Sequence, residues 1–127
     1  MKVKSIDNVN EAGMKLDGSC QPNLSSNKIY FVVGLDDQNY RLIDDINEPI
    51  LYRKELFEVI DESIPSNWVR VDYDDGEYYI DPPELSVTGF YEDYFDGNAV
   101  AIKKFNRYMK LNGLISNNEK GSRGIKK

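Results

Sequence analysis

The sequence predicts an α+β fold, a small, strongly bent β-sheet or barrel with one C-terminal amphipathic helix. Short runs of β-branched and aromatic residues, separated by turn residues, follow one another between residues 28 and 80. A single stretch with helical periodicity comes after them. We therefore expect an N-terminal extension (1–27), a β-rich domain that includes the helix (28–113) and a basic, disordered tail (114–127).

The first predicted strand covers residues 28–35, a run of β-branched and aromatic residues with polar turn residues on both sides. A short alternating run, 40–43, is followed by the predicted turn 44–47, because Asp and Asn favour turn conformations. The chain then returns as a strand over 48–52, and Pro49 places this strand at a sheet edge or at its own start.

Residues 53–60 are compatible with a short helical turn or with a further strand, since eight residues do not separate the two periods. The clearest hairpin signal pairs residues 68–73 with 77–80 across an Asp-Asp-Gly turn. Tyr78 and Tyr79 are adjacent, so a strand points them to opposite faces and leaves one of them exposed. Residues 89–97, rich in aromatic and acidic side chains, are predicted to be a loop.

The C-terminal helix is predicted from one apolar face and from its two ends. Asp96 or Asn98 is a suitable N-cap, and Gly113 stands where a C-terminal cap belongs. The residues on the apolar face are Ala101, Ile102, Phe105, Tyr108 and Met109.

Residues 28–33 (KIYFVV) and 40–59 (YRLIDDINEPILYRKELFEV) resemble small Src-homology-3-like barrel proteins of bacteria and their phages. This resemblance implies a five-stranded Src-homology-3-like barrel and no particular activity. In size, acidity and aromatic content the whole chain is also similar to the immunity proteins that protect bacteria from their own secreted toxins.

The composition excludes many catalytic sites. The chain has no histidine and only one cysteine, Cys20, which removes histidine-based acid/base catalysis, Cys/His zinc sites and internal disulfides. Its glycines are isolated and form no phosphate-binding loop. We expect a protein that is not an enzyme, with no catalytic residues and no cofactor. A hydrolase with paired carboxylates is the less favoured alternative.

Two acidic clusters are candidate metal sites. An EF-hand loop that starts at Asp72 requires Gly at its sixth position and Glu at its twelfth, where the chain has Glu77 and Pro83. Glu92, Asp93 and Asp96 have neither a histidine nor a phosphate-binding loop beside them. We therefore expect no metal site.

Charge is distributed unevenly along the chain. The formal net charge is −6, yet residues 36–96 contain 18 acidic against 4 basic residues. Such a segment repels nucleic acid and attracts basic proteins, although acidic residues also serve solubility alone. With no apolar run long enough for a signal peptide or a membrane span, the sequence predicts a cytoplasmic protein without nucleic-acid or membrane partners.

The leading functional hypothesis combines the acidic segment with its aromatic residues. Carboxylates bind Lys and Arg, and tyrosines anchor protein interfaces. The hypothesis is an immunity or antitoxin protein that covers the basic active site of a cognate toxin, for example a nuclease; the alternative is a Src-homology-3-like protein-interaction module. The predicted partner-binding residues are Asp72, Asp74, Asp75, Glu77, Tyr78, Tyr91, Glu92, Asp93, Tyr94 and Asp96.

Overall fold

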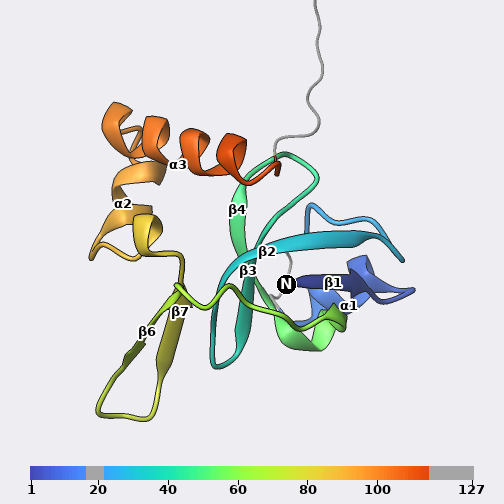
Figure 1. The fold of residues 1–127 in the computed structure, drawn as a ribbon. Coiled ribbons are helices and arrows are strands. Elements are labelled where there is room, and N and C mark those ends of the chain that lie inside the picture. The colour runs from blue at the N-terminus through green and yellow to red at the C-terminus, as the bar shows by residue number, and fades with distance from the viewer. Residues whose placement is uncertain (17–21, 115–127) are drawn as a thin grey trace, which may run out of the picture. The chain divides into compact units, whose positions relative to one another are not determined.

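The computed structural model describes residues 1–16 and 22–114 (Figure 1). They form an α+β fold with seven antiparallel strands and three α-helices, which confirms the predicted class. The chain divides into two compact units, Met1–Pro83 and Glu84–Lys127, and the boundary between them falls within the predicted domain 28–113. Cys20 and all of the predicted basic tail except Leu114 lie outside the described residues.

The first unit contains the sheet and one α-helix. Its elements are β1 (Lys2–Ser5), α1 (Val9–Leu16), β2 (Ile29–Asp36), β3 (Asn39–Ile43), β4 (Pro49–Arg53), a 3₁₀ turn η1 (Lys54–Leu56), β5 (Phe57–Asp61), β6 (Val69–Asp72) and β7 (Tyr78–Asp81). The strand order is β4-β3-β2-β1-β5, and β7 pairs with both β2 and β6.

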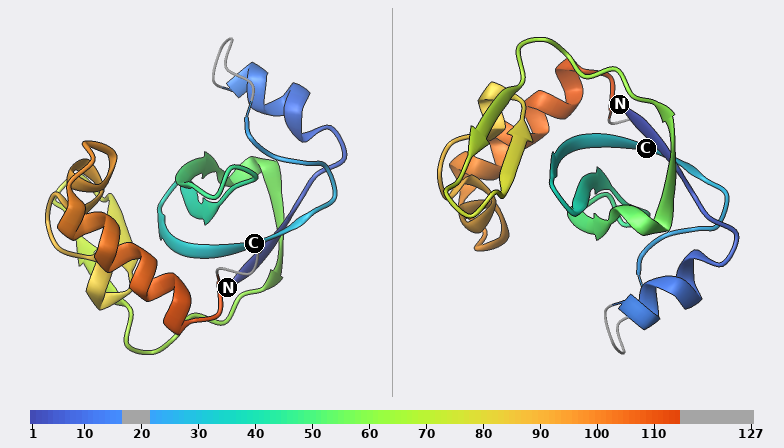
Figure 2. Two further views of the ribbon diagram at one scale, coloured as in Figure 1. Left: turned by 90° about the horizontal axis from the view of Figure 1, so that it is seen from above. Right: turned by 90° about the horizontal axis from the view of Figure 1, so that it is seen from below.

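Strand β2 is long and strongly curved (Figure 2). Its first residues pair with β1, while Leu35 pairs with Tyr40 of β3 on one side and with Ile80 of β7 on the other. Among the described strands no ladder joins β4 to β5, so the sheet is open and the predicted barrel closure is not found. Because β2 bends, its first residues pair with β1 and its later residues pair with β3 and β7.

The predicted strands at 28–35, 40–43 and 48–52 are confirmed as β2, β3 and β4. Pro49 is the first residue of an edge strand, where its missing N–H costs no ladder hydrogen bond. The ambiguous segment 53–60 contains both alternatives, since η1 leads directly into β5.

Strand β1 lies between β2 and β5, although its residues belong to the predicted N-terminal extension. Four residues of alternating Lys and small side chains form no apolar run, so this strand gives almost no sequence signal. Val3 and Val9 are nevertheless fully buried. The buried core that they join consists of Val3, Val9, Leu24, Tyr30, Val32, Leu35, Tyr40, Leu42, Tyr52 and Leu56.

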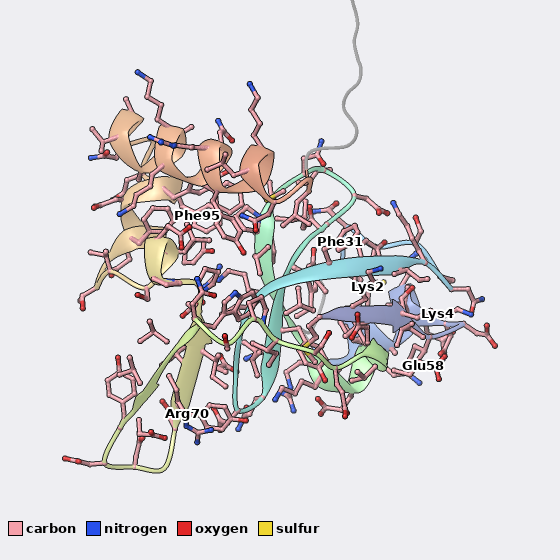
Figure 3. The ribbon with its side chains drawn as sticks, in the orientation of Figure 1. Lys2, Lys4, Phe31, Glu58, Arg70 and Phe95 are labelled. Carbon is pink, nitrogen blue, oxygen red and sulfur yellow. The ribbon has the colours of Figure 1, made fainter. Side chains whose placement is uncertain are left out.

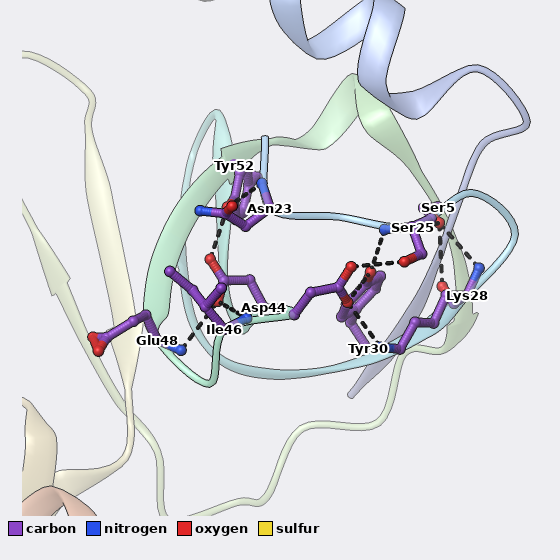
Figure 4. A network of polar contacts seen from close by, with 10 residues as sticks. Ser5, Asn23, Ser25, Lys28, Tyr30, Asp44, Ile46, Glu48 and Tyr52 are labelled. Atoms are coloured by element: carbon purple, nitrogen blue, oxygen red, sulfur yellow. Dashed lines mark hydrogen bonds and ion pairs between the residues drawn. The ribbon is translucent and has the colours of Figure 1, made fainter. Parts of the chain in front are cut away.

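Buried polar contacts fix the turn between β3 and β4 (Figure 4). The Tyr52 hydroxyl donates to Oδ2 of buried Asp44 at 2.8 Å, and Oδ1 of Asp44 accepts from the backbone N–H groups of Ile46 and Glu48. Burial raises the pKa of Tyr52, and the Asp44 carboxylate raises it further. The turn prediction at 44–47 is thus confirmed, with Asn47 at a positive φ of 60°.

The second unit, over its described residues, contains α2 (Phe90–Phe95) and α3 (Ala99–Leu111), preceded by a 3₁₀ turn η2 (Pro83–Leu85) at the boundary. The prediction of a loop over 89–97 is wrong. The helix α2 starts after Gly89, whose left-handed φ of 78° turns the chain, and the Asp93 N–H bonds the Gly89 carbonyl. Six residues are too few for a visible helical period.

The predicted helix α3 and both of its caps are confirmed. Oδ1 of Asn98 accepts from the N–H groups of Val100 and Ala101, each at 3.0 Å. At the other end, Gly113 has a φ of 68°, and the Leu114 N–H bonds the Met109 carbonyl, which is a Schellman cap. The buried residues are Ala101, Phe105, Tyr108 and Met109, with Ile102 half-buried beside them.

Candidate functional site

The candidate site is the β6–β7 hairpin. The predicted pairing is confirmed, with Val71 opposite Tyr79 and Asp72 opposite Tyr78. Gly76 takes a φ of 90° at the tip, and the Tyr73 N–H bonds the Glu77 carbonyl at 2.8 Å. The Asp-Asp-Gly sequence therefore forms the tight turn that its residue types favour.

One face of the hairpin packs onto the core. Tyr78 and Ile80 lie against the buried cluster, together with Trp68, which precedes β6. The guanidinium carbon of Arg70 lies 4.2 Å from the centroid of the Tyr78 ring, and Figure 3 shows Arg70 on this hairpin. This inner face is structural, so the predicted anchor Tyr78 is half-buried.

The opposite face is exposed and apolar. Strand alternation places Val69, Val71 and Tyr73 together on this side, with Tyr79 on the neighbouring strand. Tyr73 is 53% exposed and Tyr79 is 38% exposed. Their rings meet edge to face, with centroids 5.5 Å apart and planes at 90°. These four residues form the outer face of the hairpin.

Carboxylates surround the outer face. Asp72 is paired with Arg70 at 3.1 Å, whereas Asp74, Asp75 and Glu77 have no ion pair among the described residues. Burial raises the pKa of the Tyr79 hydroxyl, and the negative charges of Glu77, Asp36 and Asp37 raise it further. The acidic rim therefore extends from the hairpin tip to the turn between β2 and β3.

The predicted site residues fall into two groups. Asp72, Asp74, Asp75, Glu77 and Tyr78 belong to the hairpin, and the acidic residues among them are exposed. The others lie in the second unit, in and just after α2: Tyr91, Glu92, Asp93, Tyr94 and Asp96.

Within the second unit, the tyrosines pack in an aromatic cluster. Tyr91 and Tyr94 are half-buried, and the Tyr94 ring lies 5.1 Å from that of Phe105. The acidic residues Glu92, Asp93 and Asp96 are exposed, and so is Phe95, which Figure 3 marks on α2. These tyrosines contribute mainly to packing within their own unit.

Sequence reasoning missed the exposed aromatic pair. It selected Tyr78, although Tyr73 and Tyr79 form the exposed pair. A usable signal existed: once Gly76 sets the turn, alternation from Trp68 puts Tyr73 on the face opposite Trp68, which carries Val69 and Val71.

The outer face presents exposed apolar and aromatic area with exposed carboxylates beside it. Within residues 1–16 and 22–114, no three Asp, Glu, Cys or His side chains are grouped so as to hold a metal ion. The same residues include no helix that is long and apolar enough to span a membrane. No protein-family model, curated protein or solved structure matches the chain.

Proposed function

We propose that the protein is an immunity or antitoxin protein, which neutralises a cognate bacterial toxin by covering a cationic site with the outer face of the β6–β7 hairpin. The observation that carries this proposal is the Tyr73–Tyr79 pair, exposed on an apolar strip and bordered by carboxylates that have no ion pair among the described residues.

Both parts of this surface suit a basic protein. Exposed tyrosines supply large, rigid contact area and are frequent binding hot spots. Exposed carboxylates attract Lys and Arg of another protein and speed the encounter. The first unit as a whole contains 17 acidic against 8 basic residues, so its long-range field adds to this attraction. For a nuclease target, the carboxylates would stand in for substrate phosphates.

The experiment combines protection with capture. The tagged protein is produced in its native cells, and a protein that co-purifies is identified by mass spectrometry and produced with and without the immunity protein. We expect the captured protein to be basic and toxic alone, and co-production to restore growth.

The decisive variant is D74K/D75K/E77K, with D7K/E11K/E62K as the matched control. Both change the net charge equally, and all six carboxylates are exposed in the first unit. The hairpin variant should lose capture and protection, while the control keeps both. Equal behaviour of the two variants would contradict a specific role for the hairpin.

A Src-homology-3-like interaction module is the second candidate. Its support is that the resembling residues, 28–33 and 40–59, fall on β2, β3, β4, η1 and β5, and that β1 to β5 form one continuous path of five strands. Such a module needs no toxin. A captured partner that is harmless, and whose affinity ignores salt, would favour this candidate.

A further inference from the structure

The outer side of α3 carries a continuous row of positive charge. At 3.6 residues per turn, Lys103, Arg107 and Lys110 project from the side opposite buried Phe105, and Lys104 lies at the edge of that side. All four cations are exposed. No carboxylate lies within 4.0 Å of their charged groups in the part of the chain that the structure describes.

Two aliphatic side chains lie on the same side of α3. Val100 is 76% exposed near the start of the helix, and Leu111 is 72% exposed at its end. The packing of the second unit uses the other side of the helix, so it explains neither residue. These aliphatic groups, and cations that have no ion pair among the described residues, are available for contact with a second macromolecule.

The outer face of the hairpin is complementary to this side of α3. On the hairpin, Asp74, Asp75 and Glu77 border Val69, Val71 and two tyrosines; on α3, four cations lie beside Val100 and Leu111. Neither these three carboxylates nor these four cations have an ion pair among the described residues. We propose that α3 of one copy of this chain docks on the outer face of the β6–β7 hairpin of a second copy. Since each copy has both surfaces, two reciprocal contacts would close a symmetric dimer.

Charge favours a second copy over a nucleic acid or an anionic membrane. The chain carries a net charge of −6, and Glu92, Asp93 and Asp96 are exposed on the unit that carries α3. These acids repel phosphates, whereas the hairpin of a second copy supplies carboxylates together with apolar groups that match Val100 and Leu111. Two short elements bury little area, so the dimer is weak and forms at high protein concentration.

Self-association would cover the surface to which a toxin is proposed to bind. The dimer is then a resting form, which a cationic partner of higher affinity displaces. The dimer does not depend on the proposed function, because it needs only the two surfaces of this chain. The α3 variants in the tests below should lose the dimer and still bind toxin, because they leave the hairpin unchanged. Loss of toxin binding in the hairpin variant alone would count neither for nor against the dimer.

The test is sedimentation equilibrium of the full chain in 0.05 M and 0.5 M NaCl. We expect a mass that rises with concentration from 14.6 kDa toward about twice that value in low salt, and at least tenfold weaker association in high salt. The variants are K103E/K104E/R107E/K110E on α3 and D74K/D75K/E77K on the hairpin. Each should be monomeric alone, because each presents like charges on both surfaces.

An equimolar mixture of these two variants should associate again, because every contact then joins opposite charges. K103Q/K104Q/R107Q/K110Q gives a second test without charge reversal, since Gln keeps good helix propensity, and it should also be monomeric. Circular dichroism verifies that each variant folds. A monomeric wild type at about 0.5 mM in low salt, unchanged association of the Gln variant, or a mixture that stays monomeric would overturn the proposal.

Discussion

The carboxylate of Asp81 lies directly over the Cα of Gly34, in the space where any other residue would place its Cβ. Asp81 ends β7, and Gly34 lies in β2, the strand to which β7 is paired. Burial raises the pKa of Asp81 to about 6; the positive charge of Arg41 acts against this rise, and the negative charge of Asp36 adds to it. The position of the candidate hairpin on the sheet therefore depends on a glycine and a partly buried acid.

Replacing Gly34 with Ala should destabilise the first unit by about 1–3 kcal/mol, because the new Cβ would collide with the Asp81 carboxylate. Urea unfolding followed by the fluorescence of Trp68, the only tryptophan, measures this change. The double variant G34A/D81A should be almost as stable as D81A alone, because the alanine side chain at position 81 leaves room for the new methyl group. Strictly additive effects of the two substitutions would show that the residues do not compete for this space.

Asp81 should also make stability depend on pH. Its pKa is about 6 in the folded protein and about 3.9 in an unfolded chain, so the folded state binds the proton more tightly. The resulting stabilisation is complete below pH 4 and is lost as the pH rises through 6. After a discount for partial solvent exposure, we expect the wild type to lose about 1–2 kcal/mol relative to Asp81→Asn between pH 4 and 7. Parallel profiles of the two proteins would disprove this assignment.

The Tyr52 hydroxyl should contribute to stability through its hydrogen bond to buried Asp44. Tyr52→Phe leaves that carboxylate oxygen without its donor and should cost about 1–3 kcal/mol of unfolding free energy in urea titrations. Tyr73→Phe removes the hydroxyl of an exposed ring and should change stability by less than about 0.5 kcal/mol. A similar loss of unfolding free energy in both variants would show that the buried hydrogen bond contributes no more to stability than the exposed hydroxyl does.

Asn98 should stabilise the second unit as the N-cap of α3. Asn98→Ala removes the acceptor for two backbone N–H groups and should cost about 1 kcal/mol, whereas Asn98→Asp keeps an acceptor and should cost little. Thermal unfolding followed by circular dichroism distinguishes the two variants. An alanine variant as stable as wild type would show that another group caps the helix.

The sequence predicted most elements whose residues signal their own geometry. The Asp-Asp-Gly turn of the β6–β7 hairpin and the caps of α3 at Asn98 and Gly113 depend on local residue preferences, and the structure has all of them. The strand β1 and the short helix α2 were missed, since neither has a readable period. Barrel closure depends on contacts between strands distant in sequence, which composition does not reveal.

The candidate site was predicted in part. The hairpin acids were identified because they are consecutive in the sequence. The sequence left open which aromatic side chains of the hairpin are exposed: in the structure Tyr78 packs toward the core, while Tyr73 and Tyr79 are exposed. Which face of a hairpin is buried is decided by the strand on which it packs, here β2, and adjacent tyrosines do not carry that information.

The most direct test of the central claim measures association and dissociation rates between the purified chain and its captured toxin at several salt concentrations. We expect D74K/D75K/E77K to slow association at least tenfold in 0.05 M NaCl, with the difference shrinking as salt rises, and Y73A/Y79A to speed dissociation at least tenfold. Rates that are independent of salt and unchanged in both variants would contradict recognition through the outer face of the β6–β7 hairpin.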